Sequence, residues 1–218
     1  MNYLAVDTAS KTLKVLVSFN GKREYFQCAD FKAASVSLMP EVDRLMKASG
    51  ATLDDMDFFA CVTGPGSFTG IRIGMATVKA FAYVTSKPVV SVTALELLAY
   101  NNSGEETALA VCDASNGMRY VAVYDDKMRM IMSPRCLSAG ELAEFVETVD
   151  EPYGIYTEAE LADELPSAKV PEDFEKAFAL AVEHNSADAK SGNAVEPLYI
   201  RKPQAERDLE AKHAAPRD

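Results

Sequence analysis

The chain has little of what metal and redox sites are built from. It contains no tryptophan and only two histidines, His184 and His213. Its four cysteines lie far apart and form no CxxC pair, which argues against a Cys/His metal site and against a histidine-based catalytic triad. Most of them lie in or beside apolar runs, where a free thiol packs as a small core residue. The cysteines are Cys28, Cys61, Cys112 and Cys136.

Long hydrophobic runs are also missing. No stretch approaches the ~20 apolar residues that a membrane-spanning helix needs, so the sequence argues against a spanning protein and against a membrane partner. The first residues, Met1–Asp7, lack the basic start and apolar run of a signal peptide and favour a first strand instead. We therefore expect a cytoplasmic protein.

Basic residues are scarce relative to acidic ones. Lys and Arg number 22 against 33 Asp and Glu, a net charge of −11. Without a basic stripe to follow a phosphate backbone, we expect no tight autonomous nucleic-acid binding. Residues 141–175 hold twelve acids and one base, Lys169. We interpret this stretch as a solvated surface, and the alternative is a docking face for a basic partner.

What remains is the composition of a globular protein. The 218 residues are 48% hydrophobic and 25% charged, and this length allows one large domain or two small lobes. Strands are predicted at 3–6, 12–19, 22–28, 58–62 and 89–92, with an Asn20-Gly21 hairpin turn between the second and third. Helices are predicted to end at Gly50, near Thr85 and at Tyr100. Their predicted N-caps are Ser35 or Ser37 for the first helix and Thr93 for the third.

The second half of the sequence repeats part of the first half. Residues 4–10, LAVDTAS, match residues 109–115, LAVCDAS, at five of seven positions, and an alternating strand follows each copy. Strands are predicted near 107–112, 119–125 and 127–132. A helix from Glu141 with a Ser138 capping box and another near 172–184 are predicted to follow. We expect an α/β protein with an N-terminal lobe at 1–102, a smaller C-terminal lobe at 103–200 and a charged tail at 201–218.

Two loops at strand ends are candidate binding sites. The first, residues 7–10, either meets a ligand or forms an Asx-type turn. The second, residues 64–70 (GPGSFTG), is neither a Walker A loop nor a dinucleotide fingerprint, and it serves either anion binding or tight packing. Gly70 and Gly74 also give the following helix a bare stripe that a partner helix could approach. Candidates for an anion or nucleotide loop are Asp7, Thr8, Ser10, Gly64, Gly66, Ser67, Thr69, Gly70 and Arg72.

No carboxylate pair has a catalytic arrangement. Asp54, Asp55 and Asp57 follow Thr52 and are typical of a helix start. Glu96 stands among leucines and is predicted to face the surface. Arg72 either reaches an anion held by the loop or points into solvent.

Five segments together resemble one family. The most specific is Gly64–Gly74, GPGSFTGIRIG; the others are 4–8, 35–40, 88–96 and Pro197–Arg201 (PLYIR). They resemble the TsaB family, accessory proteins of bacterial tRNA threonylcarbamoyladenosine synthesis. The resemblance implies an actin-like ATPase fold, the ribonuclease H-like fold of sugar kinases and Hsp70, with two duplicated halves of which the second is truncated.

The same resemblance implies a non-catalytic paralogue of TsaD, the enzyme that transfers threonylcarbamoyl to the adenosine beside the tRNA anticodon. It implies binding to TsaD, association of the TsaE ATPase with that complex, and a homodimer when alone. No cofactor is required, beyond a weak ATP or ADP contact at the partner interface. The metal-binding histidines of the enzyme fall on Val92 and Glu96, and Ala34 stands where the family usually has histidine. A valine cannot ligate a metal, so we expect no metal-dependent chemistry.

The resemblance places the partner interface on the first two helices, although the same side chains could instead form the domain's own core. The runner-up function is a small-molecule kinase or ATPase of the same fold, and a metallopeptidase fails on the missing ligands. Candidate interface residues are Val36, Met39, Pro40, Asp43 and Met46 on the first helix, and Ile73, Ala76, Thr77, Ala80 and Tyr83 on the second.

Overall fold

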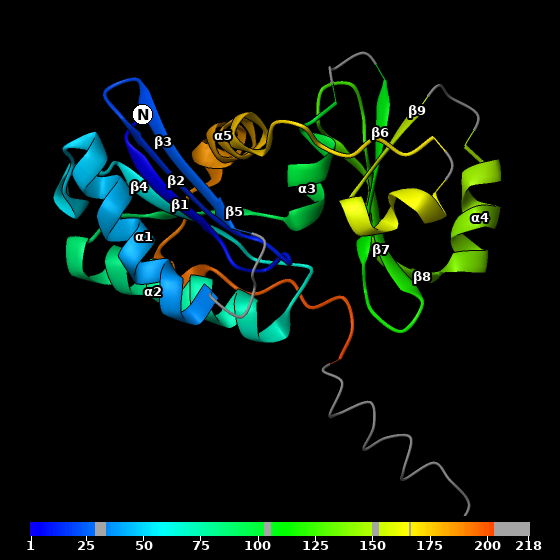
Figure 1. The fold of residues 1–218 in the computed structure, drawn as a ribbon, viewed down its shortest axis with the longest axis horizontal. Coiled ribbons are helices and arrows are strands. Elements are labelled where there is room, and N and C mark those ends of the chain that lie inside the picture. The colour runs from blue at the N-terminus through cyan, green and yellow to red at the C-terminus, as the bar shows by residue number, and fades with distance from the viewer. Residues whose placement is uncertain (29–33, 103–105, 150–152, 166, 203–218) are drawn as a thin grey trace, which may run out of the picture.

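The chain forms two lobes, each built on one mixed β-sheet (Figure 1). The computed structural model describes residues 1–28, 34–102, 106–149, 153–165 and 167–202. The first sheet has the order β3-β2-β1-β4-β5 and the second the order β8-β7-β6-β9. Among the described residues, no helix combines the length and apolar character needed to cross a bilayer.

The first sheet grows from an N-terminal hairpin. β1 (Tyr3–Asp7) runs antiparallel to β2 (Leu13–Phe19), which pairs with β3 (Lys22–Cys28). Asn20 and Gly21 join the two strands with φ of 51° and 76°, the positive values that a type I′ turn requires. β4 (Phe58–Val62) then pairs in parallel with β1, and β5 (Val89–Val92) in parallel with β4. All five strands were predicted from the sequence.

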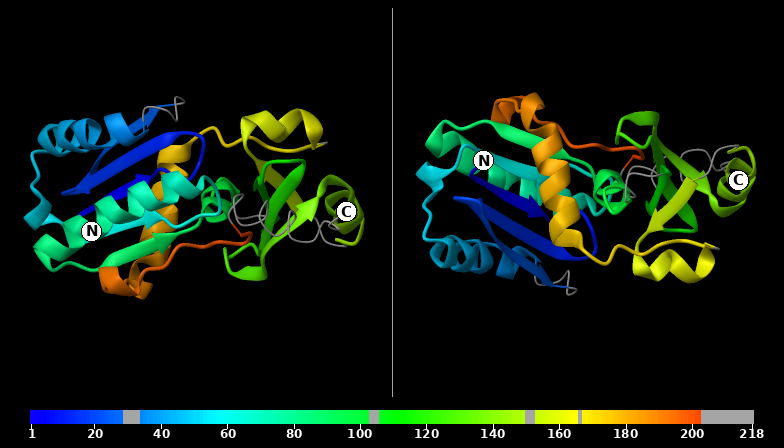
Figure 2. Two further views of the ribbon diagram at one scale, coloured as in Figure 1. Left: turned by 90° about the horizontal axis from the view of Figure 1, so that it is seen from below. Right: turned by 90° about the horizontal axis from the view of Figure 1, so that it is seen from above.

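Helices cover both faces of this sheet. α1 (Ala34–Ser49) and α2 (Phe68–Thr85) lie on one face and α5 (Phe174–His184) on the other (Figures 1 and 2). Leu38, Val42 and Leu45 put one stripe of α1 into the core, as their spacing requires. The predicted N-caps of α1 are wrong, because the helix already begins at Ala34 and so contains both Ser35 and Ser37.

The second sheet repeats the first in shortened form. It contains β6 (Thr107–Asp113), β7 (Met118–Tyr124), β8 (Met130–Ser138) and β9 (Tyr153–Thr157). The strand predicted at 127–132 lies later, because Asp125 donates its N–H to the Arg129 carbonyl and closes a turn over these residues. β9 was not predicted and lies inside the acidic stretch. α4 (Ala139–Glu147) begins with the predicted Ser138–Glu141 capping box, two residues before the predicted start.

The sequence repeat is also a structural repeat. Leu4 and Val6 of β1 belong to the first core, while Leu109 and Val111 of β6 pack with Leu142 of α4 in the second lobe. In both lobes the first strand pairs antiparallel with the second and parallel with the strand after the next helix. This duplicated arrangement is the expected actin-like ATPase fold, with a second half that lacks a fifth strand among its described residues.

Two helices pack against the sheet of a lobe other than the one that the predicted boundaries assign them to. α3 (Ala94–Ala99) falls within residues 1–102, yet Leu95 and Leu98 pack against the second sheet, while its Leu97 joins the first core. α5 falls within 103–200, yet Phe178 and Val182 lie in the first core. α3 therefore packs between the two lobes, and α5 packs on the first one. The short 3₁₀ helices are η2 (Leu53–Asp55), η3 (Ala159–Glu164), η4 (Asn185–Asp188) and η5 (Gly192–Ala194).

Candidate functional site

The loop after β1 is held by a buried ion pair. Asp7 and Lys14 face each other in the register of β1 and β2, and Lys14 Nζ lies 2.8 Å from Asp7 Oδ2. The same oxygen accepts from Ser10 Oγ at 2.5 Å, and Oδ1 accepts from the Ala9 N–H at 2.9 Å. The Asx-turn interpretation of this loop is therefore confirmed. The sequence analysis did not single out Lys14, because a lysine in an alternating strand usually faces solvent.

In the second lobe, the carboxylate at the end of the first strand is also paired with basic side chains. Asp113, at the end of β6, lies opposite Arg119 of β7, with the two side chains 3.6 Å apart. Lys11 of the first lobe also reaches Asp113, at 3.4 Å, and so bridges the lobes. Divalent cations bound with nucleotides need free carboxylate oxygens. Here the carboxylates at the ends of both first strands are already paired with basic side chains.

The Gly-rich loop packs closely on the first loop. A Cβ at Gly66, where φ is 155°, would clash with the Ala9 carbonyl, and the Ser67 N–H donates to that same carbonyl at 2.8 Å. Ser67 then caps α2 by accepting from the Gly70 N–H at 3.1 Å. The glycine therefore permits close backbone approach, which was one of the two roles left open for this loop.

The bare stripe on α2 faces the protein's own first strand, so the expectation that it receives a partner helix is wrong. Thr8 Oγ1 donates to the Gly70 carbonyl at 2.7 Å. A Cβ at Gly74 would clash with Thr8 Oγ1 and would touch Val6. Both glycines let α2 lie directly against the end of β1. Of the loop candidates, Thr8 is buried and Thr69 is exposed.

Arg72 belongs to an aromatic stack. Its guanidinium lies 4.0 Å from the centre of the Phe68 ring, and Phe68 stacks on Tyr199 with ring centres 4.5 Å apart. Arg72 Nε also donates to the Tyr199 hydroxyl at 3.3 Å. Arg72 is exposed, as the solvent-facing alternative predicted. Its contacts with Phe68 and Tyr199 also tie α2 to the returning C-terminal segment.

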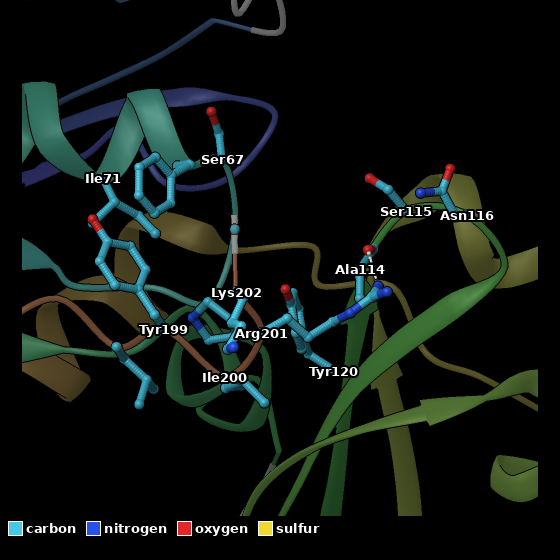
Figure 3. A pocket seen from close by; sticks show the side chains of 14 residues that line it. Ser67, Ile71, Ala114, Ser115, Asn116, Tyr120, Tyr199, Ile200, Arg201 and Lys202 are labelled. Atoms are coloured by element: carbon cyan, nitrogen blue, oxygen red, sulfur yellow. Dashed lines mark hydrogen bonds between the residues drawn. The ribbon is translucent and has the colours of Figure 1, made fainter. Parts of the chain in front are cut away.

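A cleft of about 560 Å³ lies between the lobes beside this stack (Figure 3). Ser67 and Tyr199 lie on one wall, and Ser115 and Asn116 of the second lobe lie on the other. Arg201 crosses between the walls and donates from Nη1 to the Ala114 carbonyl at 3.0 Å.

A smaller hollow of about 240 Å³ continues from the cleft toward Lys11, Asp113 and Glu158. Glu158 follows β9 and accepts from the Asp113 N–H at 3.3 Å. Burial raises the pKa of the Glu158 carboxyl, against the lowering effect of that hydrogen bond and of Lys11.

The outer face of α1 and α2 exposes large apolar side chains. On α1, Val36 is 75% exposed and Met39 50%, and on α2, Tyr83 is 84% exposed and Val84 71%. Pro40, Asp43, Ala76 and Ala80 are also exposed, and Ile73 and Thr77 are half-buried. The structure removes one predicted interface residue, Met46, because its side chain lies in the core. It adds Val84, which the sequence analysis did not single out.

The remaining candidate carboxylates serve caps. Glu96 accepts from the Thr93 N–H at 2.6 Å and from Asn185 Nδ2 at 3.2 Å, so the prediction that it faces the surface is wrong. Asp55 forms the predicted cap with Thr52. Val92 is fully buried in β5. Across the described ranges, no three His, Cys, Asp or Glu side chains gather in a way that could hold a metal ion.

Fold and site together define a duplicated protein of the actin-like ATPase class with neutralised loop carboxylates and an exposed apolar helical face. Residues 31–148 match the family model described as TsaD: tRNA N6-adenosine threonylcarbamoyltransferase. Curated relatives are the tRNA threonylcarbamoyladenosine biosynthesis proteins TsaB of Haemophilus influenzae and Escherichia coli, which are 27% and 31% identical to this chain. The chain belongs to this family, and within it to the TsaB group that these relatives represent.

The extent of the likeness differs between sequences and structures. The match to the Haemophilus influenzae protein covers 59% of this chain and 56% of that protein, and the match to the Escherichia coli protein covers 57% and 55%. The chain thus spans about half the length of these curated relatives. A solved Pseudomonas aeruginosa protein, described as similar to peptidase YEAZ, superposes with a TM-score of 0.73 at 23% identity. That superposition covers 92% of this chain and 99% of the other, and it shows the shared fold.

Proposed function

We propose that this chain is the non-catalytic partner of a TsaD-type threonylcarbamoyltransferase in the synthesis of threonylcarbamoyladenosine in tRNA. It binds that enzyme through α1 and α2 and supports association of a TsaE-type ATPase with the complex. The observation that carries the proposal is the exposed apolar face, where Val36, Met39, Tyr83 and Val84 stand in solvent on two helices of one sheet face. Large apolar side chains that stand exposed on neighbouring helices are candidates for burial against a protein partner.

The loop geometry supports a binding role over phosphoryl transfer. Lys14 forms an ion pair with Asp7, and Arg119 and Lys11 form ion pairs with Asp113. Neither carboxylate is therefore free to hold a nucleotide-bound cation. The position expected to carry a metal-binding histidine is the buried Val92. The curated relatives are named as proteins of tRNA threonylcarbamoyladenosine biosynthesis, which supports a role for this chain in that pathway. Under this proposal the chain requires no cofactor, works in the cytoplasm, and meets ATP or ADP only weakly at the partner interface.

The same helical face also accounts for a homodimer when the enzyme is absent. A second copy can cover the apolar side chains until the catalytic partner takes its place, because both would bury the same residues. The exposed alanines on α2, Ala76 and Ala80, leave room for a partner helix to come close. Replacing Ala80 with a long charged side chain should therefore block both assemblies.

The test is light-scattering chromatography with and without the TsaD-type protein of the same organism. The expected result is a stable one-to-one complex that Met39→Arg and Ala80→Arg abolish. Ala143→Arg is the matched control, because Ala143 is exposed on α4 of the other lobe and should leave the complex intact. Absence of a complex, with or without ATP, would contradict the proposal. ATP turnover lost on Asp7→Ala would then favour the small-molecule kinase or ATPase.

A further inference from the structure

Two sequence motifs that the docking face leaves unexplained meet at the interlobe cleft. Gly64–Gly74 forms the loop and the first turns of α2, and Pro197–Arg201 returns beside it more than a hundred residues later. The Leu198 N–H donates to the Thr63 carbonyl at 2.8 Å, and Tyr199 stacks on Phe68. Arg201 then reaches the second lobe at Ala114. The two motifs therefore build one concave surface, whose side chains Figure 3 shows.

The charge of this cleft is opposite to that of the chain. Its lining includes Arg201 and Lys202 and, among the described residues, no carboxylate, although the protein carries a net charge of −11. The carboxylates of Asp113 and Glu158 line the smaller adjoining hollow instead, where Lys11 also lies. Arg72 lies at the edge of the cleft through its contact with Phe68. Basic side chains that line a hollow raise the local concentration of anions there, so this lining favours an anionic ligand.

The cleft also offers aromatic faces. Tyr199 is exposed, with one ring face on Phe68, and Tyr120 enters the lining from the second lobe. Hydroxyl groups of Ser67 and Ser115 lie on opposite walls. Aromatic rings beside arginine and lysine are the usual means by which proteins hold unpaired nucleotides, because every base can stack and every phosphate can pair.

We propose that this cleft holds an unpaired nucleotide of the tRNA while the catalytic partner acts on the same tRNA. A magnesium-bound triphosphate fits poorly, since Asp7 and Asp113 are paired with basic side chains, whereas a phosphodiester needs no metal ion. Arg201 and Lys202 supply too little charge for tight binding alone, so the contact adds to binding by the complex. The inference rests on the proposed function for the identity of the RNA.

The test is fluorescence anisotropy of labelled tRNA titrated with the complex. Tyr199→Ala is expected to weaken binding by about fivefold or more, the lower range for losing one stacked base. Lys202→Glu is expected to weaken binding as well. Lys202→Glu should also reduce the slope of log affinity against log salt by about 0.7, as for one lost phosphate contact to a single strand. Lys127→Glu is the matched control, because Lys127 is exposed in the β7–β8 turn, and it should leave affinity unchanged.

Each variant is first tested for complex formation by light scattering, which separates the two proposals. Normal complexes with unchanged tRNA affinity for both variants would overturn the inference and leave the proposed function standing. Binding of AMP that depends on Tyr199, with tRNA affinity unaffected, would also overturn it and assign the cleft to a free nucleotide. If the wild-type chains form no complex, the proposed function fails. The inference rests on that function and then fails with it, whereas the first two outcomes overturn the inference alone.

Discussion

Replacing Lys14 with methionine should destabilise the protein strongly. Methionine keeps most of the side-chain length but removes the ammonium that lies 2.8 Å from Asp7 and 2.7 Å from Ser10 Oγ. Both members of the ion pair are buried, so Asp7 would lose its counter-charge at a site that water does not reach. Breaking a buried pair in this way costs about 3–5 kcal/mol. That is a large share of the roughly 5–15 kcal/mol by which a typical domain is stable.

The same chain provides a matched control. Lys47 and Asp43 form an ion pair of 2.6 Å on the surface of α1, where both side chains are exposed. Lys47→Met should change the free energy of unfolding by no more than about 0.5 kcal/mol, as for exposed pairs one helical turn apart. Asp7→Asn added to Lys14→Met should recover most of the lost stability, because asparagine still accepts from the Ala9 N–H and carries no charge.

Urea unfolding, with linear extrapolation to water, measures all of these differences. A loss below about 1 kcal/mol for Lys14→Met would refute the buried-pair argument, and so would a double variant no more stable than the single one. The double variant also bears on function. If Asp7 serves only structure, the refolded double variant should still bind the TsaD-type partner, as light scattering would show.

Three smaller predictions follow from the same contacts. Gly74→Ala should cost roughly 1–3 kcal/mol in urea unfolding because its Cβ would strike Thr8, whereas Gly140→Ala meets open space and should be neutral or stabilising. Burial raises the pKa of Glu158, so ionisation costs stability. Glu158→Gln should therefore be more stable than wild type at pH 8 and lose that advantage as pH falls below the ordinary carboxyl range, where folded and unfolded chains are both protonated. Burial also raises the pKa of Cys61 to about 12, so iodoacetamide at pH 8 should label it only after unfolding, as peptide mass spectrometry would show.

Local signals were sufficient for most of the fold. Alternating strands, the Asn20-Gly21 turn and the caps at Thr93 and Ser138 all depend on neighbours within a few residues, and the structure has them where predicted. β9 escaped prediction because five residues surrounded by acids carry too weak a periodic signal. The exchange of α3 and α5 between lobes escaped for another reason. Which sheet an apolar helix covers depends on contacts far away in the sequence.

The site shows the same division. The sequence located the Gly-rich loop, and it offered the Asx turn at Asp7 as one of two alternatives. It could not show that Lys14 neutralises Asp7, because a lysine in an alternating strand usually faces solvent. Nor could it orient the glycine stripe of α2, since small residues permit close approach by any neighbour. The sequence could not reveal the cleft either, because Tyr199 and Phe68 come into contact only in the folded chain.

The connections between the lobes hold the two walls of the cleft together. α3 contributes Leu97 to one core and Leu95 to the other, and α5 crosses back to the first sheet. Lys11 and Arg201 add polar contacts across the cleft itself. Because all of these contacts join the two lobes, we expect the cleft to keep one shape. A preformed site loses less entropy on binding than one that must close. Under the proposed function, a catalytic partner on α1 and α2 would therefore meet the cleft at a fixed distance and orientation.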